Sequence, residues 1–201
     1  HDAGFEDYPE LYDPLSRWYH RFSARLAVKK AYHIFTVSEF SKERIVENYS
    51  DLSLDPSPRQ GREGTLENKI TVTYLGIDQD FSARLPDARA SAIAGTAEKR
   101  WSIGKKYDLR EKNYILYVGR LEPKKNILNM VRAHEMAEVN MPLVLAGRRI
   151  DIQNAEKYLE RRPELKSKTR FLNYFDEQDK AALYEGASIF LFPTLYEGFG
   201  L

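Results

Sequence analysis

A regular alternation of strand-like and helix-like segments in the last ninety or so residues most constrains the fold of this chain. Short runs rich in β-branched, aromatic and aliphatic residues are separated by segments of helical character, and these runs are 114–118, 143–146, 170–174 and 188–192. Strands joined by helices of about ten residues or more run parallel, so the pattern predicts a doubly wound α/β sheet. Ligands of such sheets bind at the carboxyl ends of the strands. The loops at those ends are therefore the first candidates for a functional site.

The first part of the chain predicts a second, smaller α/β region. Residues 15–32 have the spacing of an amphipathic helix, and the side chains on its apolar face are Leu15, Trp18, Tyr19, Phe22, Leu26 and Ala27. The run 34–37 (IFTV) reads as a buried strand, and Ser38 is placed to cap the next helix. A further strand is expected at 70–74. Polar stretches at 51–68 and 79–112 read as loops, so we expect two domains, 1–78 and 79–201.

Composition and charge exclude several classes of function. The 201 residues include 31 basic and 30 acidic side chains, a net charge of +1, so no strong bulk field steers the protein toward nucleic acid or an anionic membrane. The chain contains no cysteine, which excludes a disulfide framework and thiolate metal sites and fits a reducing compartment. No apolar run approaches the roughly 20 residues that span a bilayer. We expect a cytoplasmic protein, with the inner face of the membrane as the alternative location.

The loop after residues 114–118 carries the chemistry of an anion site. Gly119 lets the backbone approach a ligand, Arg120 offers a planar set of donors, Lys125 adds a point charge, and Asn126 is placed to cap the next helix. A helix N-terminus adds free N–H groups and a positive dipole. The loop therefore predicts a diphosphate pocket. A solvated basic loop stays open as the alternative.

Two other strand ends carry candidate residues. The stretch LYEGFGL (195–201) places Glu197, an acceptor for sugar hydroxyls, beside Gly198 and Gly200, which permit close backbone approach. An ordinary glycine-rich turn is its alternative. Tyr174 is placed to stack on a nucleobase, and packing in the core is the alternative there. The stretch 147–149 (GRR) reads as a strand-ending glycine followed by solvated arginines.

Several of these segments carry a family resemblance. YVGRLEPKKNI, LVLAG and ALYEGASIFLFPTLYEGFGL resemble the donor-binding half of the retaining glycosyltransferases of family 4, which have the GT-B architecture of two facing Rossmann-like domains. HDAGFEDYPE, FTVSEFSKERI and TYLGID are similar to the end of that family's acceptor domain and its crossover into the donor domain. The resemblance spans most of the chain except its two irregular stretches. It implies Rossmann-like parallel sheets flanked by helices.

The resemblance also implies roles for individual residues. In that family the matching Arg and Lys bind the donor's diphosphate, the Glu contacts the donor sugar, and the backbone amides after it contact the sugar and the phosphate. The residue after the third donor-domain strand lines the base pocket, although Asn173 stands where the family more often has glycine. The implied catalytic residues are His1 and Glu197. The implied donor-binding residues are Gly119, Arg120, Lys125, Tyr174, Gly198, Phe199, Gly200 and Leu201.

The implied activity is transfer of a hexosyl group from a nucleotide-diphosphate sugar to an acceptor hydroxyl, with retention of the anomeric configuration. We expect no cofactor and no metal, since Arg120, Lys125 and a helix N-terminus neutralise the leaving diphosphate. The D-x-D triplet Asp78-Gln79-Asp80 is the competing metal pattern. The expected partners are the sugar nucleotide and a glycan, lipid-linked or other hydroxyl acceptor, but no nucleic acid. Peripheral membrane association of the whole protein is a further expectation.

The resemblance includes departures that bear on activity. The family's second carboxylate, eight positions beyond the match to Glu197 in the Glu-x7-Glu pattern, would fall after Leu201, and the first half of the acceptor domain is also missing. We therefore expect an excerpt of a larger enzyme with little or no transferase activity by itself. The alternatives are a related nucleotide-sugar epimerase or phosphorylase, or a non-catalytic sugar-nucleotide-binding module. Acidic residues at 176–179 read as complements of a helix dipole.

Overall fold

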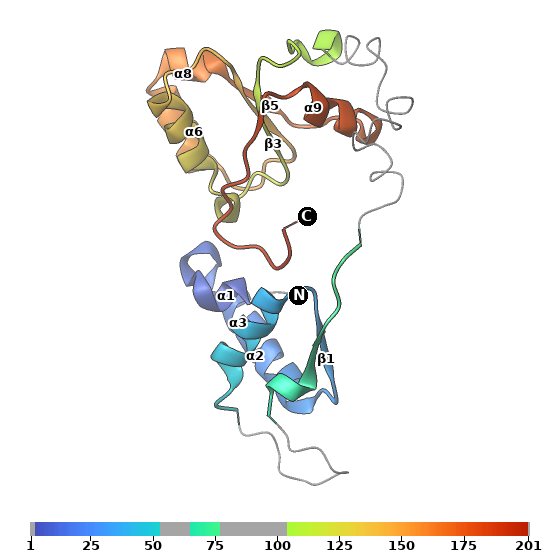
Figure 1. Ribbon diagram of the computed structural model, residues 1–201. Coiled ribbons are helices and arrows are strands. Elements are labelled where there is room, and N and C mark those ends of the chain that lie inside the picture. The colour runs from blue at the N-terminus through green and yellow to red at the C-terminus, as the bar shows by residue number, and fades with distance from the viewer. Residues whose placement is uncertain (1–2, 53–64, 77–103, 201) are drawn as a thin grey trace, which may run out of the picture. The chain divides into compact units, whose positions relative to one another are not determined.

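The structure, a computed structural model, describes residues 3–52, 65–76 and 104–200 (Figure 1). The chain forms two compact units, one made of His1–Gly76 with Tyr196–Leu201 and the other of Ile77–Leu195. The sequence analysis assigns everything after residue 78 to one domain. In the structure Tyr196 and the described residues after it group with the first unit, so both units contain residues from the candidate list.

The second unit is built on a parallel sheet of strand order β5-β4-β3-β6. The strands are β3 (Ile115–Val118), β4 (Leu143–Ala146), β5 (Thr169–Leu172) and β6 (Ile189–Phe190). Ile115 pairs with Leu143 on one side and with Ile189 on the other. Leu116 and Val144 in the central strands are fully buried, as a parallel sheet covered on both faces requires. The predicted parallel α/β class is confirmed.

Helices cover both faces of this sheet (Figure 1). Helices α6 (Ile127–Met136), α7 (Gln153–Glu160) and α8 (Pro163–Lys168) pack on one face, where Tyr117 and Leu145 point. Helix α9 (Lys180–Gly186) packs on the other face, against Leu116 and Val144. Neighbouring strand residues thus alternate between two hydrophobic clusters, because successive side chains of a strand point to opposite faces.

Some elements of this unit differ from those that the sequence predicts. Helix α8 starts with Pro163 in the first turn, a position that suits proline because the missing N–H has no partner there anyway. The acidic residues 176–179, expected at the start of a helix, instead lie in and beside the 3-10 turn η5 (Glu177–Asp179) that precedes α9. The strand expected over 188–192 is only two residues long, although Leu191 still donates from its N–H to the Leu116 carbonyl at 2.8 Å.

The first unit combines short helices with two parallel strands. Its elements are α1 (Gly4–Asp7), η1 (Pro9–Leu11), α2 (Pro14–Lys30), β1 (Ile34–Thr36), α3 (Glu39–Tyr49), η2 (Glu67–Lys69) and β2 (Ile70–Val72). Ile34 pairs with Ile70, and Thr36 with Val72. A small core joins these elements through Val28, Tyr49, Leu66 and Ile70. Ser38 caps α3 as predicted, since its side chain accepts from the N–H of Ser41 at 3.0 Å.

Charged side chains fasten α1 to the two longer helices of this unit. Glu6 accepts from Arg21 of α2 and from the hydroxyl of Tyr49 of α3. Burial, together with this bond to Glu6, raises the pKa of the Tyr49 hydroxyl well above its usual value. Asp7 forms a two-pronged ion pair with Arg44 of α3, which raises the pKa of that guanidinium. These charged contacts hold α1 in place, because so short a helix has few apolar side chains to pack.

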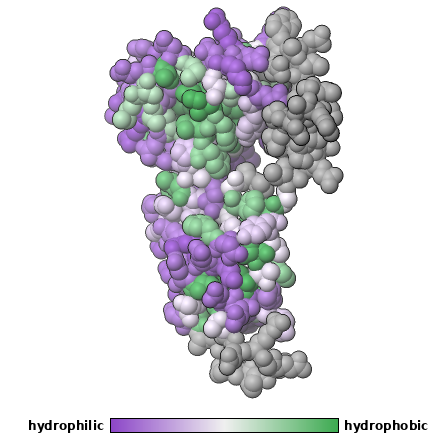
Figure 2. All heavy atoms as spheres, viewed as in Figure 1, coloured by the Kyte–Doolittle hydropathy of each residue, from purple (hydrophilic) through white to green (hydrophobic). Residues whose placement is uncertain are grey.

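The surface of the protein exposes several large apolar side chains. The face shown in Figure 2 mixes hydrophilic residues with patches of hydrophobic ones. The apolar face predicted for residues 15–32 exists on α2, but Leu15, Trp18, Tyr19, Phe22 and Leu26 are exposed. The helix packs through Ala24 and Val28 instead. In the described part of the chain, no helix combines the length and the apolarity needed to cross a membrane.

Replacing Gly147 with alanine tests the close approach of β3 and β4 at their carboxyl ends. A Cβ at Gly147 would lie 1.9 Å from the carbonyl oxygen of Gly119, and the φ of Gly147 is 143°. We expect Gly147→Ala to lower the free energy of unfolding by about 2 kcal/mol or more, measured by urea denaturation. Gly76→Ala is the control, because nothing lies within 4 Å of its added Cβ. Equal stability of the two variants would contradict the prediction.

Candidate functional site

The loop that follows β3 is held in a fixed conformation by its own backbone. Gly119 has a φ of 150°, and its N–H donates to the Ala146 carbonyl at 2.9 Å. A Cβ at this position would lie 2.7 Å from the hydroxyl oxygen of Tyr117. That hydroxyl donates to the carbonyl of Arg120 at 3.1 Å. Glycine is therefore required directly before the first candidate cation.

The loops after β3 and β4 continue side by side beyond the sheet. Leu121 is fully buried, and its N–H donates to the Arg148 carbonyl at 2.8 Å, forming a parallel bridge between Leu121 and Arg149. The N–H of Ile150 returns a bond to the Leu121 carbonyl at 2.9 Å. The 3-10 turn η4 (Pro123–Lys125) follows. Burial of Leu121 anchors the loop, so the charged residues on either side of it are held at the sheet edge.

Asn126 plays a different part from the one that the sequence predicts. It adopts the left-handed conformation, with φ 61°, and its side chain makes no capping bond to α6. Its side-chain amide instead donates to the Pro193 carbonyl at 3.1 Å, and its Oδ1 accepts from Asn129 at 2.8 Å. Asn126 does stand at the N-cap position of α6, but the expected side-chain cap is absent, and its amide bonds the segment after β6 instead. Asparagine tolerates this backbone conformation better than most residues.

The segment that leaves β6 lies against the loop after β3. The N–H of Leu195 and the hydroxyl of Thr194 both donate to the Lys124 carbonyl, at 2.9 and 3.1 Å. Together with the bond from Asn126 to Pro193, these contacts join residues 119–126 to residues 193–195. The loops that follow β3 and β6 therefore meet within the second unit, while a shared site of the loop after β3 and the glycine-rich turn stays a prediction. We call residues 119–125 the cation loop.

The two candidate cations of this loop differ in their surroundings. The side chain of Arg120 is 66% exposed and pairs with the Glu122 carboxylate, Nη2 to Oε2, at 3.1 Å. The ammonium of Lys125 lies 5.7 Å from the centre of the Phe192 ring, close enough for a cation–π contact. An anion that reaches Arg120 has to compete with Glu122.

The glycine turn at the end of the chain, residues 196–200, is built on the first unit. Tyr196 is buried, and its hydroxyl accepts from the N–H of Ala3 at 3.1 Å. The hydroxyls of Ser38 and Ser41 both donate to the carbonyl of Gly198, the second at 3.0 Å. The N-terminal end of α3 therefore holds the backbone of the turn. The sequence analysis assigns Ser38 only to the helix cap and misses this second contact.

The other candidates of the turn are partly enclosed. Phe199 lies beside Tyr74, with 6.4 Å between ring centres, and Glu197 is half-buried. Gly200 has a φ of 87°, in the region where side chains other than glycine are strained. The turn therefore needs glycine at this position for its backbone alone. The role of Glu197 in sugar contact stays a prediction.

The third strand end shows one contact that the sequence analysis does not predict. Tyr174 is 80% exposed, so the alternative of a core tyrosine is wrong, and stacking on a base stays a prediction. Arg149 is not simply solvated, because its Nε donates to Asn173 at 2.6 Å and its guanidinium lies 4.3 Å from the centre of the Phe171 ring. The sequence carries a repeated signal at these strand ends, since Gly-Arg directly follows both β3 and β4.

Several predicted residues lie outside the described part of the chain. These are His1, Leu201 and the triplet Asp78-Gln79-Asp80. Among the described residues, no group of three or more His, Asp or Glu side chains could hold a metal ion. The acidic residues after β5 have partners of their own, because Lys106 binds both Asp176 and Asp179.

Comparison with known proteins adds a family match and related sequences. Residues 99–201 match the family model described as glycosyl transferases group 1. The chain is 29% identical over 206 aligned residues to O-antigen chain mannosyltransferase B of Escherichia coli. This alignment covers all of this chain and 47% of that protein. The chain is also 26% identical to O-antigen chain mannosyltransferase RfbU of Salmonella typhimurium, covering all of this chain and 46% of that protein. The chain thus spans about half the length of these curated relatives.

Solved structures share the fold at low sequence identity. A crystal structure of Anabaena HepE in complex with UDP and glucose matches 96% of this chain and 45% of its own, with a TM-score of 0.65 and 18% identity. A sucrose-phosphate synthase from Thermosynechococcus elongatus matches all of this chain and 45% of its own, with a TM-score of 0.63 and 20% identity. At these identities the likeness establishes the fold alone.

Replacing Ser41 with alanine tests how the glycine turn is held. The change removes one of the two hydroxyls that donate to the Gly198 carbonyl, and alanine is a good helix former, so α3 should persist. Loss of a hydrogen bond worth about 1 kcal/mol should speed amide hydrogen exchange in residues 196–200 about fivefold. Ser50→Ala, at the exposed end of α3, is the control and should leave the exchange unchanged. Unaltered exchange in Ser41→Ala would refute the contact.

Proposed function

Because this chain belongs to the glycosyl transferases group 1 family, we propose that the protein transfers a hexosyl group from a nucleotide-diphosphate sugar to a hydroxyl of a glycan acceptor. The relatives named as O-antigen chain mannosyltransferases favour mannose as the sugar and a growing polysaccharide as the acceptor. The structural relative that is bound to UDP and glucose supports a nucleotide sugar as the donor.

The observation that carries this proposal is the joined pair of loops at the carboxyl edge of the second unit's sheet. Leu121 anchors the cation loop, and Lys124 and Asn126 bind the segment that leads into the glycine turn. Arg120 and Lys125 are thereby held on a rigid frame rather than on a mobile loop. In the proposed reaction their charges stabilise the diphosphate as it leaves the sugar, where fixed donors contribute most.

The glycine turn supplies the proposed contacts to the sugar. In this proposal Glu197 accepts hydrogen bonds from the sugar hydroxyls, and the backbone amides of Phe199, Gly200 and Leu201 contact the sugar and phosphate. Two serine hydroxyls and the buried Tyr196 hold the backbone of this turn, which supports a positioning role. His1 near the anomeric carbon, Tyr174 beside the base, and retention of configuration stay predictions.

The proposed reaction needs no metal ion and is sugar transfer rather than a related reaction. Arg120 and Lys125 carry the charge compensation that a metal ion supplies in other transferases, so catalysis without a metal stays our expectation. The transferase names of the relatives favour sugar transfer over epimerisation, phosphorolysis or sugar-nucleotide binding without turnover. Analysis of the products with a sugar nucleotide and an acceptor separates these activities. Location in the cytoplasm or at the membrane's inner face also stays a prediction.

Removing the two cations tests the donor site. We expect Arg120→Ala and Lys125→Ala, made in the whole protein, each to weaken binding of the sugar nucleotide by about 1.5–3 kcal/mol, because each removes a hydrogen bond to a charged phosphate. Titration calorimetry measures the change. Arg161→Ala is the control, since Arg161 is an exposed cation of the same unit at the end of α7. Donor binding that is equal in all three variants would remove the diphosphate assignment.

A further inference from the structure

The glycine turn is anchored within the first unit on both sides of Glu197. Before Glu197, the side chain of Tyr196 is buried, and its hydroxyl accepts from the N–H of Ala3 at 3.1 Å. After Glu197, the carbonyl of Gly198 accepts from the hydroxyls of two serines at the N-terminal end of α3. All of these residues belong to the first unit. The backbone that carries Glu197 is therefore fixed one residue before it and one residue after it.

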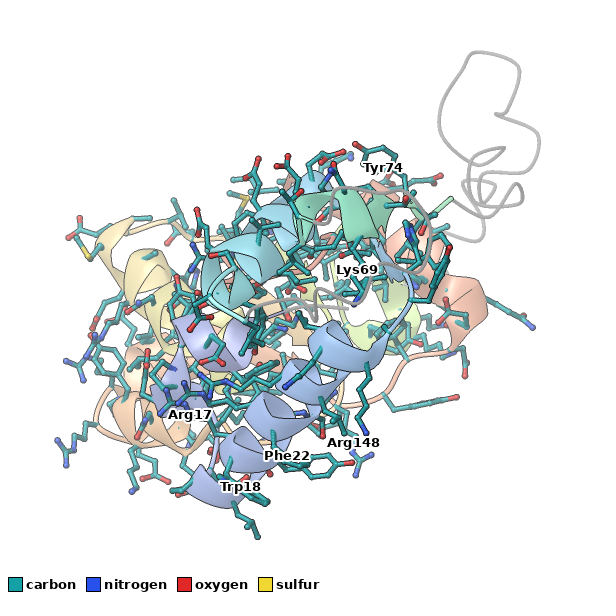
Figure 3. The ribbon with its side chains drawn as sticks, turned by 90° about the horizontal axis from the view of Figure 1, so that it is seen from below. Arg17, Trp18, Phe22, Lys69, Tyr74 and Arg148 are labelled. Atoms are coloured by element: carbon teal, nitrogen blue, oxygen red, sulfur yellow. The ribbon has the colours of Figure 1, made fainter. Side chains whose placement is uncertain are left out.

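The anchor formed by Tyr196 is closely packed. A Cβ at Gly4 would come within 3.1 Å of the Tyr196 ring, so the start of α1 lies directly against that ring. The ring also contacts Phe40 of α3, with 5.4 Å between ring centres. Arg17, labelled in Figure 3, donates from its Nε to the Phe5 carbonyl at 3.2 Å and ties α1 to α2. The Tyr196 hydroxyl thus meets a backbone segment that is itself held in place.

The anchor formed by the serines sets the direction of a peptide group. The C=O and the N–H of a trans peptide point in opposite directions. The Gly198 carbonyl faces the serine hydroxyls of α3, so the N–H of Phe199 faces away from them. In the part of the chain that the structure describes, this N–H has no hydrogen-bond partner. The serines therefore leave the Phe199 amide available to a ligand on the side away from α3.

Two hydrogen bonds to one carbonyl also strengthen the amide on the other side of the same peptide. A carbonyl oxygen has two lone pairs, and Ser38 and Ser41 each donate to that of Gly198. Hydrogen bonds in such a chain polarise one another, which makes the Phe199 N–H a better donor. Helix capping does not account for both serines. The hydroxyl of Ser41 is fully buried and takes no part in the cap, which Ser38 makes to the Ser41 N–H.

We propose that Ser38, Ser41 and Tyr196 are positioning residues of the transferase. They fix the backbone of Glu197 and aim the N–H of Phe199 at the sugar nucleotide. This inference rests on the proposed function and adds to it three residues that do not themselves contact the donor. A donor held slightly out of place still binds but reacts slowly, because catalysis needs the reacting groups aligned. Loss of a positioning residue should therefore lower kcat more than it raises KM.

Substitutions at Ser38 separate its helix cap from its bond to the turn. Ser38→Asp keeps an N-cap acceptor for α3, but a carboxylate has no proton to donate to the Gly198 carbonyl. We expect Ser38→Asp to lower kcat by about tenfold or more and to change the donor KM by less than about twofold. Ser38→Thr carries a hydroxyl that can make both contacts, so it should rescue the activity. Steady-state kinetics of the whole protein, with GDP- and UDP-linked mannose and glucose as donors, measure both constants.

The other two positioning residues each lose one polar group. Ser41→Ala removes one donor to the Gly198 carbonyl, and Tyr196→Phe removes the acceptor for the Ala3 N–H but keeps the ring. Each should lower kcat by about fivefold with little change in the donor KM, the effect of losing one hydrogen bond. Tyr8→Phe is the matched control, because Tyr8 packs on the Tyr196 ring and its hydroxyl has no hydrogen-bond partner among the described residues.

A second measurement does not depend on turnover. In the whole protein labelled with ¹⁵N-phenylalanine, the amide signal of Phe199 should shift when the same sugar nucleotides are added. The signal is assigned by its absence in Phe199→Leu. Ser38→Asp should reduce the shift, because its turn no longer holds the amide in one direction. Circular dichroism checks that Ser38→Asp keeps its helices, as the retained cap predicts.

The outcomes separate this inference from the proposed function. If the parent protein transfers no sugar, the proposed function fails, and the response of the Phe199 amide still decides the inference. The inference is overturned if the parent transfers sugar while Ser38→Asp and Ser41→Ala keep its kcat. It is also overturned if these variants raise the donor KM as much as they lower kcat, or if the Phe199 signal does not respond to any of the nucleotides.

Discussion

The candidate donor site depends on the close backbone approach of β3 and β4 at their carboxyl ends. Only glycine at positions 119 and 147 allows it, because a Cβ on Gly147 would overlap the Gly119 carbonyl. The approach lets the two loops pair past the end of the sheet and buries Leu121 between them. A buried leucine is what turns an exposed, charged loop into a rigid one. This packing sets the backbone from which Arg120 and Lys125 extend, and their contacts with Glu122 and Phe192 add to it.

The candidate residues are shared between two units that hold them by different means. The second unit fixes the cation loop through backbone hydrogen bonds and the buried Leu121. The first unit fixes the glycine turn through the serines at the start of α3 and through the aromatic side chain of Tyr196. One short stretch connects these two arrangements along the chain, where the Thr194 hydroxyl and the Leu195 N–H both donate to the Lys124 carbonyl.

Hydrophobic periodicity predicts where a helix forms more reliably than what its apolar face contacts. In α6 the periodic side chains Ile127, Met130 and Val131 are buried in the core, as the pattern suggests. In α2 the same kind of pattern produces an exposed aromatic and basic face. The two cases differ in the charges among the apolar residues, because α2 interleaves cations with its rings. The interleaved cations are visible in the sequence, but whether the apolar face is buried depends on which elements the fold packs against it.

The sequence by itself determined the parallel α/β class, the segments that become strands and helices, the glycines at the strand ends and the family resemblance. The class, the segments and the glycines follow from local periodicity and from backbone conformations that few residues adopt, whereas the resemblance rests on the matching motifs. Only the tertiary structure decided that Asn126 binds Pro193 instead of capping α6, that Ser38 and Ser41 share the Gly198 carbonyl, and that Arg149 lies on Phe171. The physical reason is that a polar side chain bonds whichever partner the fold brings within about 3 Å, and such partners are distant in sequence.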